Sequence, residues 1–169
     1  AIFLIVCLLL ACFFEFINGF HDTANAVATV IYTNSMKPTV AVVYSGVLNF
    51  IGVLTGGIAV AMGIVNLLPM EVLVDSNVWH GIAMILALLL SAIIWNFGTW
   101  YVGIPASSSH TIIGAILGIG LAFYWIPGEV GGSAVNWDKA KDTGLALLFS
   151  PLIGFSVAIF VMFIFKRLV

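Results

Sequence analysis

Long apolar stretches, separated by short polar segments, run along the whole chain. Five of these stretches reach the roughly 20 residues that a helix needs to cross a bilayer, and they cover residues 1–33, 39–67, 79–102, 105–124 and 143–165. The segments between them contain Pro, Gly, Asn, Ser or Asp, which favour turns, at residues 34–38, 69–77 and 127–142. The pattern predicts an all-α, polytopic membrane protein with about five membrane segments in a single domain, residues 1–169.

Composition supports a bilayer rather than water as the solvent. Hydrophobic residues make up 63% of the chain and charged residues only 7%, whereas a soluble domain carries about 25% charged residues. No charged residue occurs from position 76 to position 128, a stretch long enough for two spans, or for one span and a re-entrant hairpin. The net charge of −2 offers no basic surface for nucleic acid.

The few basic residues indicate an orientation. Lys37 lies in the first turn, and Lys166 and Arg167 follow the last apolar stretch. Because cytoplasmic loops carry an excess of Lys and Arg, five crossings that start outside the cell place both groups inside. Residue 1 is an Ala within an apolar run that no basic region precedes, so we expect no signal peptide and a chain that is part of something larger.

The first polar segment, residues 15–29, does not suit a helix that faces lipid, because a carboxylate at the bilayer centre costs roughly 2.5–3.5 kcal/mol. At helical spacing its polar side chains share one stripe: Glu15, Asn18, Asp22, Asn25 and Thr29. The stripe is therefore predicted to face protein or water. His21 lies off the stripe and is expected to be structural, and the lone amides Asn49 and Asn96 are typical of packing between helices.

Gly19 lets the chain unwind within this stripe, so the helix over residues 1–33 is predicted to be broken, with an interruption at residues 18–22. Asp22 then caps the following half-helix and offers an oxygen to a cation. The oxygens of Asp22 and of the two flanking amides suit Na⁺ or a proton better than a transition metal. Glu15 is left with two roles, a proton carrier or a structural partner of His110.

The second polar segment, residues 103–111, opens the apolar stretch 103–124. Pro105 suits the first turn of a helix, and three consecutive serines place hydroxyls and free backbone N–H groups at the helix start: Ser107, Ser108 and Ser109. A helix N-terminus carries roughly half a positive charge and binds phosphate or carboxylate readily. The segment is therefore predicted to hold an anion, the alternative being that a serine only caps the helix.

No Lys or Arg lies beside either polar segment in the sequence. An anion at the serines would meet only neutral donors and a partial dipole, and the nearby Asp22 would repel it unless a cation bound between them. The residues therefore predict that an anion and a cation enter together, which is symport. Two other hypotheses remain open: a passive channel or structural subunit, and an intramembrane serine hydrolase that uses Ser107, or Ser109, with His110.

Two stretches resemble the signatures of the PiT inorganic phosphate transporters. They are residues 19–29, Gly-Phe-His-Asp-Thr-Ala-Asn-Ala-Val-Ala-Thr, and residues 98–111, which end in Pro-Ala-Ser-Ser-Ser-His-Thr. The similarity extends along nearly the whole chain and is closest to the bacterial Pit type. It implies a low-affinity phosphate symporter, a multi-pass protein of the bacterial inner membrane built of two inverted halves, of which this chain is the first.

The resemblance also implies the site. Phosphate would bind between the two halves, coupled to H⁺ or Na⁺ and, in bacterial members, as a complex with a divalent metal. The predicted phosphate-binding residues are Ser107, Ser108, Ser109, Thr111 and Asn25, and the predicted cation-coupling residues are Asp22, Asn18, Asn25 and Glu15, with Asp22 also the candidate metal ligand. No other cofactor and no enzymatic activity are expected. The expected protein partners are the second half and, in a homodimer, a second copy.

Overall fold

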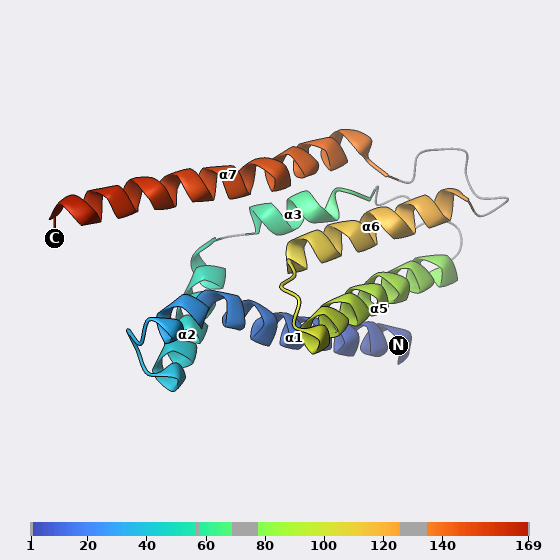
Figure 1. The fold of residues 1–169 in the computed structure, drawn as a ribbon. Coiled ribbons are helices and arrows are strands. Elements are labelled where there is room, and N and C mark those ends of the chain that lie inside the picture. The colour runs from blue at the N-terminus through green and yellow to red at the C-terminus, as the bar shows by residue number, and fades with distance from the viewer. Residues whose placement is uncertain (1, 57, 69–77, 126–134, 169) are drawn as a thin grey trace.

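The computed structural model describes residues 2–56, 58–68, 78–125 and 135–168, which form helices and connections without a strand (Figure 1). The helices are α1 (Ile2–Tyr32), α2 (Pro38–Gly56), α3 (Ala59–Val65), α5 (Val78–Val102), α6 (Ser108–Tyr124) and α7 (Trp137–Leu168). Within this part of the chain, α1, α2, α5 and α7 are long and apolar enough to cross a membrane, and α6 is a shorter apolar helix. The all-α, polytopic architecture expected from the sequence is confirmed.

Helix α1 is continuous, so the predicted break at residues 18–22 is wrong. The hydroxyl of Thr23 donates a 2.6 Å hydrogen bond to the backbone oxygen of Gly19, within the turn where unwinding was expected. A glycine inside a helix costs only about 1 kcal/mol relative to alanine. One face of α1 also packs against the rest of the protein through Phe14, Ile17, His21 and Val27, which holds the helix on both sides of the glycine.

The predicted span over residues 39–67 is wrong in a different way, because it divides into two helices. Helix α2 ends at Gly56 and α3 begins at Ala59. The sequence has two consecutive glycines at this point, and each lowers the helix propensity of the chain. Ile58 is the N-cap of α3 and makes no side-chain cap hydrogen bond.

Helices α1 and α5 run side by side in the same direction. Phe3 packs edge-on against Trp79 near their N-terminal ends, and Phe20 packs in the same way against Trp100 further along, with ring centroids 5.3 and 5.2 Å apart. Helix α6 returns antiparallel to α5, since Phe123 near its end packs against Met84 near the start of α5. A core cluster of Phe14, Ile17, Ala92 and Ile93 fills the space where α1 and α5 meet, with Ile112 and Ala115 of α6 packed against it.

The α5–α6 hairpin turns back before it reaches the end of α1. The side chain of Thr99 lies level with that of His21, 3.4 Å away. From that level α5 continues for three residues and α1 for eleven, so at about 1.5 Å per residue the turn lies roughly 12 Å short of the end of α1. Figure 1 shows this turn midway along the molecule. Helix α5 is nevertheless long enough to cross a membrane by itself, so this geometry fits both a full span and a re-entrant limb.

A glycine cap ends α5 at this turn. The backbone N–H of Gly103 donates to the oxygen of Trp100 at 3.0 Å, and that of Ile104 donates to the oxygen of Thr99 at 2.9 Å. These two bonds, with Gly103 in the left-handed region at φ +77°, form a Schellman motif. The motif redirects the chain so that residues 103–107 form a short connection to α6.

Helix α7 packs on α3 and α6 only near its start. The backbone N–H of Asn136 donates to the oxygen of Leu67 at 3.0 Å, and Ala140 and Leu147 pack against a cluster of Leu67, Leu68, Ile113 and Ile116. Figure 1 shows the C-terminal half of α7 running past the other helices, with the C-terminus at the same end of the molecule as the α1–α2 turn. The charge pattern predicts the same grouping, with Lys37 near Lys166 and Arg167. Glu71 and Asp75, in the predicted turn over residues 69–77, lie outside the described residues.

Candidate functional site

The two polar segments meet at the start of α6. The hydroxyl of Ser108 donates a hydrogen bond to Oδ2 of Asp22 on α1, at 3.0 Å and across 86 positions of sequence. A hydrogen bond from a hydroxyl to a carboxylate is among the stronger polar contacts in proteins. The bond fixes the serine-rich helix start directly beside the carboxylate of the stripe.

Helix α6 begins at Ser108, directly after Ser107 and not at Pro105. The backbone of Ser107 is extended (φ −107°, ψ 117°), and its hydroxyl accepts the backbone N–H of His110, which makes Ser107 the N-cap. Pro105 lies two residues earlier, in the connection, so the prediction that it occupies the first helical turn is wrong. The expectation that a serine caps the helix is correct for Ser107. Ser108, the next residue, instead extends to α1.

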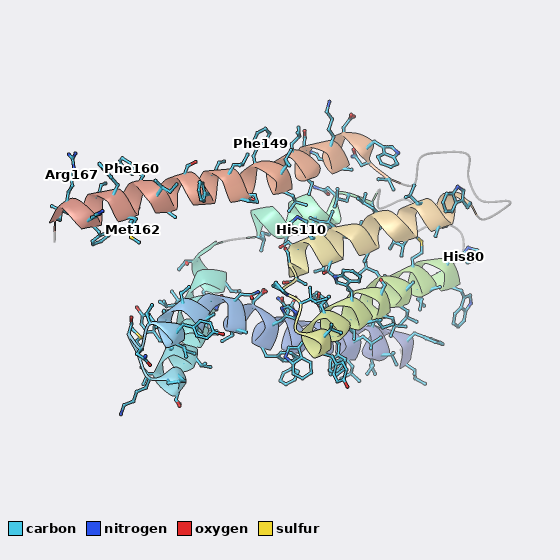
Figure 2. The ribbon with its side chains drawn as sticks, in the orientation of Figure 1. His80, His110, Phe149, Phe160, Met162 and Arg167 are labelled. Atoms are coloured by element: carbon cyan, nitrogen blue, oxygen red, sulfur yellow. The ribbon has the colours of Figure 1, made fainter. Side chains whose placement is uncertain are left out.

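Two further contacts hold the hydroxyl groups in the first turn of α6. His110 Nδ1 lies 2.8 Å from the hydroxyl oxygen of Ser107, and the hydroxyl of Thr111 lies 3.0 Å from the backbone oxygen of Ser107. Ser109 is exposed. Figure 2 shows His110 at the N-terminal end of α6, near the turn of the hairpin. The first turn of α6 therefore presents hydroxyl, imidazole and backbone N–H groups within a few residues.

The stripe on α1 forms as predicted from helical spacing, although on an unbroken helix. The side-chain amide of Asn18 donates to the carboxylate of Glu15 at 3.4 Å. Of the two roles considered for Glu15, the pairing with His110 is not seen in the described part of the chain, because Glu15 pairs with Asn18 and His110 with Ser107. Asn25 lines a small cavity of about 190 Å³ together with His21, Trp100 and residues 103–105, so it faces the hairpin turn.

Helix α5 contributes residues that sequence reasoning assigned only to packing. Asn96 is 2% exposed, and its Oδ1 accepts the hydroxyl of Thr111 at 3.0 Å, which links α5 to the start of α6. One turn later, Thr99 contacts His21 of α1. The expectation of an interhelical role is correct for Asn96. Asn49, the other lone amide, donates instead to the backbone oxygen of Ser45 in its own helix.

A groove of about 850 Å³ lies along α5 and α6 and ends at this polar cluster. Its polar end is formed by Thr99, Ser107, His110 and Thr111. Its remaining length is formed mainly by small and apolar residues, including Ala87, Gly114 and Gly118. A groove of this kind gives a small anion a polar end beside an apolar wall.

The chemistry of the cluster does not suit a hydrolase or a transition-metal centre. Ser107 and His110 are within nucleophile–base distance, but Glu15 binds Asn18 and Asp22 binds Ser108, so neither carboxylate orients the imidazole. Among the described residues, no three His, Cys, Asp or Glu side chains gather as metal ligands. A carboxylate with amide and hydroxyl oxygens instead suits a hard cation.

Known proteins resemble the chain over most of its length. The phosphate transporter family matches residues 18–169. The low-affinity inorganic phosphate transporter PitA of Escherichia coli K12 is 50% identical over 164 residues, which are 97% of this chain and 33% of that protein. A low-affinity inorganic phosphate transporter of Buchnera aphidicola is 51% identical over 146 residues, 86% of this chain and 30% of its own.

A more distant relative agrees. The probable low-affinity inorganic phosphate transporter of Bacillus subtilis is 41% identical over 154 residues, 91% of this chain and 42% of its own. The chain thus spans about one third of the length of the first two relatives and less than half of the third. No solved structure matches it significantly.

Proposed function

Because the chain belongs to the phosphate transporter family, we propose that it forms part of a protein that carries inorganic phosphate across the bacterial inner membrane by symport with a cation. The family and the relatives are transporters rather than enzymes, and the apolar helices are those of a multi-pass membrane protein. The first two relatives are about three times as long as this chain, and the Bacillus subtilis relative is more than twice as long. We therefore propose that the complete transporter also contains a second half, inverted in the membrane relative to this one.

The contact between Ser108 and Asp22 is the observation that carries symport. The hydroxyl of Ser108, at the end of α6 that is proposed to bind the anion, donates to the carboxylate of Asp22. The five Lys and Arg residues of the chain lie at Lys37, Lys139, Lys141, Lys166 and Arg167, outside both polar segments. Phosphate near Ser108 is therefore repelled by Asp22 unless a cation occupies the space between them. Simultaneous binding of both ions removes that repulsion.

We assign phosphate to the Ser108 side of this contact, on α6, and the cation to the Asp22 side, on α1. Phosphate binds at the start of α6, where Ser107, Ser108, Ser109 and Thr111 supply hydroxyls, with Asn25 of α1 facing the hairpin turn. The cation binds to the stripe on α1, at Asp22 with Asn18, Asn25 and Glu15. The coupling ion is H⁺ or Na⁺, and the substrate is free phosphate or its complex with a divalent metal, for which Asp22 is the nearest carboxylate.

The test uses the complete transporter in proteoliposomes and measures uptake of radiolabelled phosphate. Asp22→Asn keeps the shape of the side chain and an acceptor for Ser108 but removes the charge that holds the cation, so uptake is expected to fall to the level of empty liposomes. The matched control is Asp138→Asn, which removes an exposed carboxylate in the first turn of α7 and should leave uptake unchanged. Normal uptake by Asp22→Asn would overturn the proposal.

Gradients separate the coupling ions and the channel alternative. Uptake by the wild-type protein is measured with an inward Na⁺ gradient, then with a pH gradient, each with and without a divalent metal. Symport predicts uptake against a phosphate gradient when the coupling ion flows inward. Phosphate flux that follows only its own gradient would instead identify a passive channel.

A further inference from the structure

Two buried side-chain atoms lack a hydrogen-bond partner within the described part of the chain, and they are complementary. They are Oδ1 of Asn18, an acceptor, and Nδ2 of Asn96, a donor. Most buried polar atoms in proteins are paired, and exceptions call for an explanation. The other end of each amide is already engaged, because Asn18 donates to Glu15 and Asn96 accepts from Thr111.

The two amides lie at the same level of neighbouring helices. His21 of α1 and Thr99 of α5 have their side chains 3.4 Å apart. Asn18 and Asn96 each stand three residues before that pair, and α1 and α5 run in the same direction, so both amides lie about one turn away on the same side of it. Just beyond them is the apolar cluster that contains Ile17 of α1 and Ala92 of α5.

We propose that one water links Asn18 and Asn96 by hydrogen bonds to these two atoms, and that Asn96 is a positioning residue for the phosphate segment. The link completes a polar chain from Glu15 and Asn18 on α1, through Asn96 on α5, to Thr111 at the start of α6. This inference rests on the proposed function, because it assigns the two ends of the chain to the cation side and the phosphate side.

The link gives the two ions a structural connection besides their charges. A cation that binds the side-chain carbonyl oxygen of Asn18 weakens the hydrogen-bonded link from Asn18 to Asn96. Asn96 in turn holds Thr111, whose hydroxyl lies within hydrogen-bond distance of both Asn96 Oδ1 and the backbone oxygen of Ser107. Cation binding therefore alters the geometry of the first turn of α6, where phosphate is proposed to bind.

A double-mutant cycle tests the link in the complete transporter. Asn18→Leu, Asn96→Leu and the double variant are compared with wild type for initial phosphate uptake over a range of phosphate and coupling-cation concentrations. Each single variant is expected to raise the half-saturation concentration for phosphate roughly tenfold. The double variant should be no worse than the worse single variant.

Asn49→Leu is the matched control. It removes an amide of the same type that donates only within its own helix, and it should leave both half-saturation concentrations unchanged. The link is overturned if the effects of the two single variants multiply in the double variant, or if only the maximal rate falls. Should Asn96→Leu not yield a monodisperse protein, Asn96→Asp keeps an acceptor for Thr111, removes the donor and enters the same cycle.

A second readout does not depend on transport. Thermal unfolding midpoints of the four purified proteins form their own cycle, in which the link predicts a smaller shift for the double variant than the sum of the single shifts. Additive shifts would overturn the link even if phosphate transport is established. Conversely, a wild-type protein without phosphate uptake would overturn the proposed function and leave the unfolding cycle to decide on the link alone.

Discussion

For Ser108 and Asp22, the neighbouring residues in the sequence are enough to identify both as candidate site residues. Asp22 is predicted to be functional because a carboxylate is costly in the bilayer, and Ser108 because serines at a helix start can hold an anion; the structure places their side chains 3.0 Å apart. The partners of Asn96 and His21 are not predictable in this way. An isolated Asn or His in an apolar helix has the same local pattern whether it faces a neighbouring helix, a cavity or an ion, and only the packing of α5 against α1 and α6 distinguishes these cases.

Removing the hydroxyl of Ser108 should affect both ions. Hydrogen bonds to charged groups contribute roughly 1.5–3 kcal/mol, so Ser108→Ala is expected to raise the half-saturation concentrations for phosphate and for the coupling cation by about tenfold or more. The measurement is initial uptake in proteoliposomes with each ion varied in turn.

Ser109→Ala is the comparison for that prediction. Ser109 is adjacent and also proposed to bind phosphate, but the contact with Asp22 belongs to Ser108. Ser109→Ala should therefore weaken phosphate binding and leave the dependence on the cation unchanged. If the two variants have the same cation dependence, the Ser108–Asp22 contact has no part in coupling.

At the scale of the helices, spacing predicts which residues share a face but not where a helix bends. The stripe on α1 follows from the helical period. The expected break at Gly19 and the missed break after Gly56 both involve glycine, whose effect depends on packing. Gly19 lies within a turn that packs on both sides, whereas Gly56 is followed in sequence by a second glycine. Local propensity alone does not separate the two cases.

Gly103 sets the direction of the hairpin, and its substitution should disturb the site from a distance. Its φ of +77° is unfavourable for residues with a Cβ atom by roughly 1–2 kcal/mol, while no heavy atom lies within 4 Å of where that Cβ would stand. Gly103→Ala should therefore lower the thermal unfolding midpoint and reduce phosphate uptake through backbone strain alone.

Gly98→Ala is the control for this strain. Gly98 lies inside α5, also with no heavy atom within 4 Å of an added Cβ, and alanine is favoured over glycine in a helix by up to about 1 kcal/mol. Gly98→Ala should leave stability unchanged or raise it. Equal behaviour of the two variants would show that the turn at Gly103 does not require its left-handed backbone.

At the scale of the whole molecule, the apolar pattern and the charges predict the membrane class and the grouping of basic residues, but not the depth of the hairpin. Apolar length alone fits both a full span and a re-entrant limb, because α5 is 25 residues long and would cross a bilayer by itself. Its depth is apparent only from its register with α1, which is determined by aromatic and polar contacts between residues far apart in sequence.

Cys7 and Cys12, both within the apolar part of α1, are free thiols in the structure.

The depth of the hairpin turn leads to a labelling prediction for the complete transporter. With Cys7 and Cys12 replaced by alanine, single cysteines are introduced at Ser35 in the α1–α2 turn, Arg167 at the end of α7, Asp138 at its start and Ile104 in the hairpin turn. In sealed vesicles, a membrane-impermeant maleimide should label positions 35 and 167 from one side and position 138 from the other. Position 104 lies roughly 12 Å short of the end of α1, by helical rise, so it should react much more slowly than position 35 from the same side. Labelling of positions 104 and 35 at equal rates from that side would mean that α5 crosses the bilayer completely and would exclude a re-entrant hairpin.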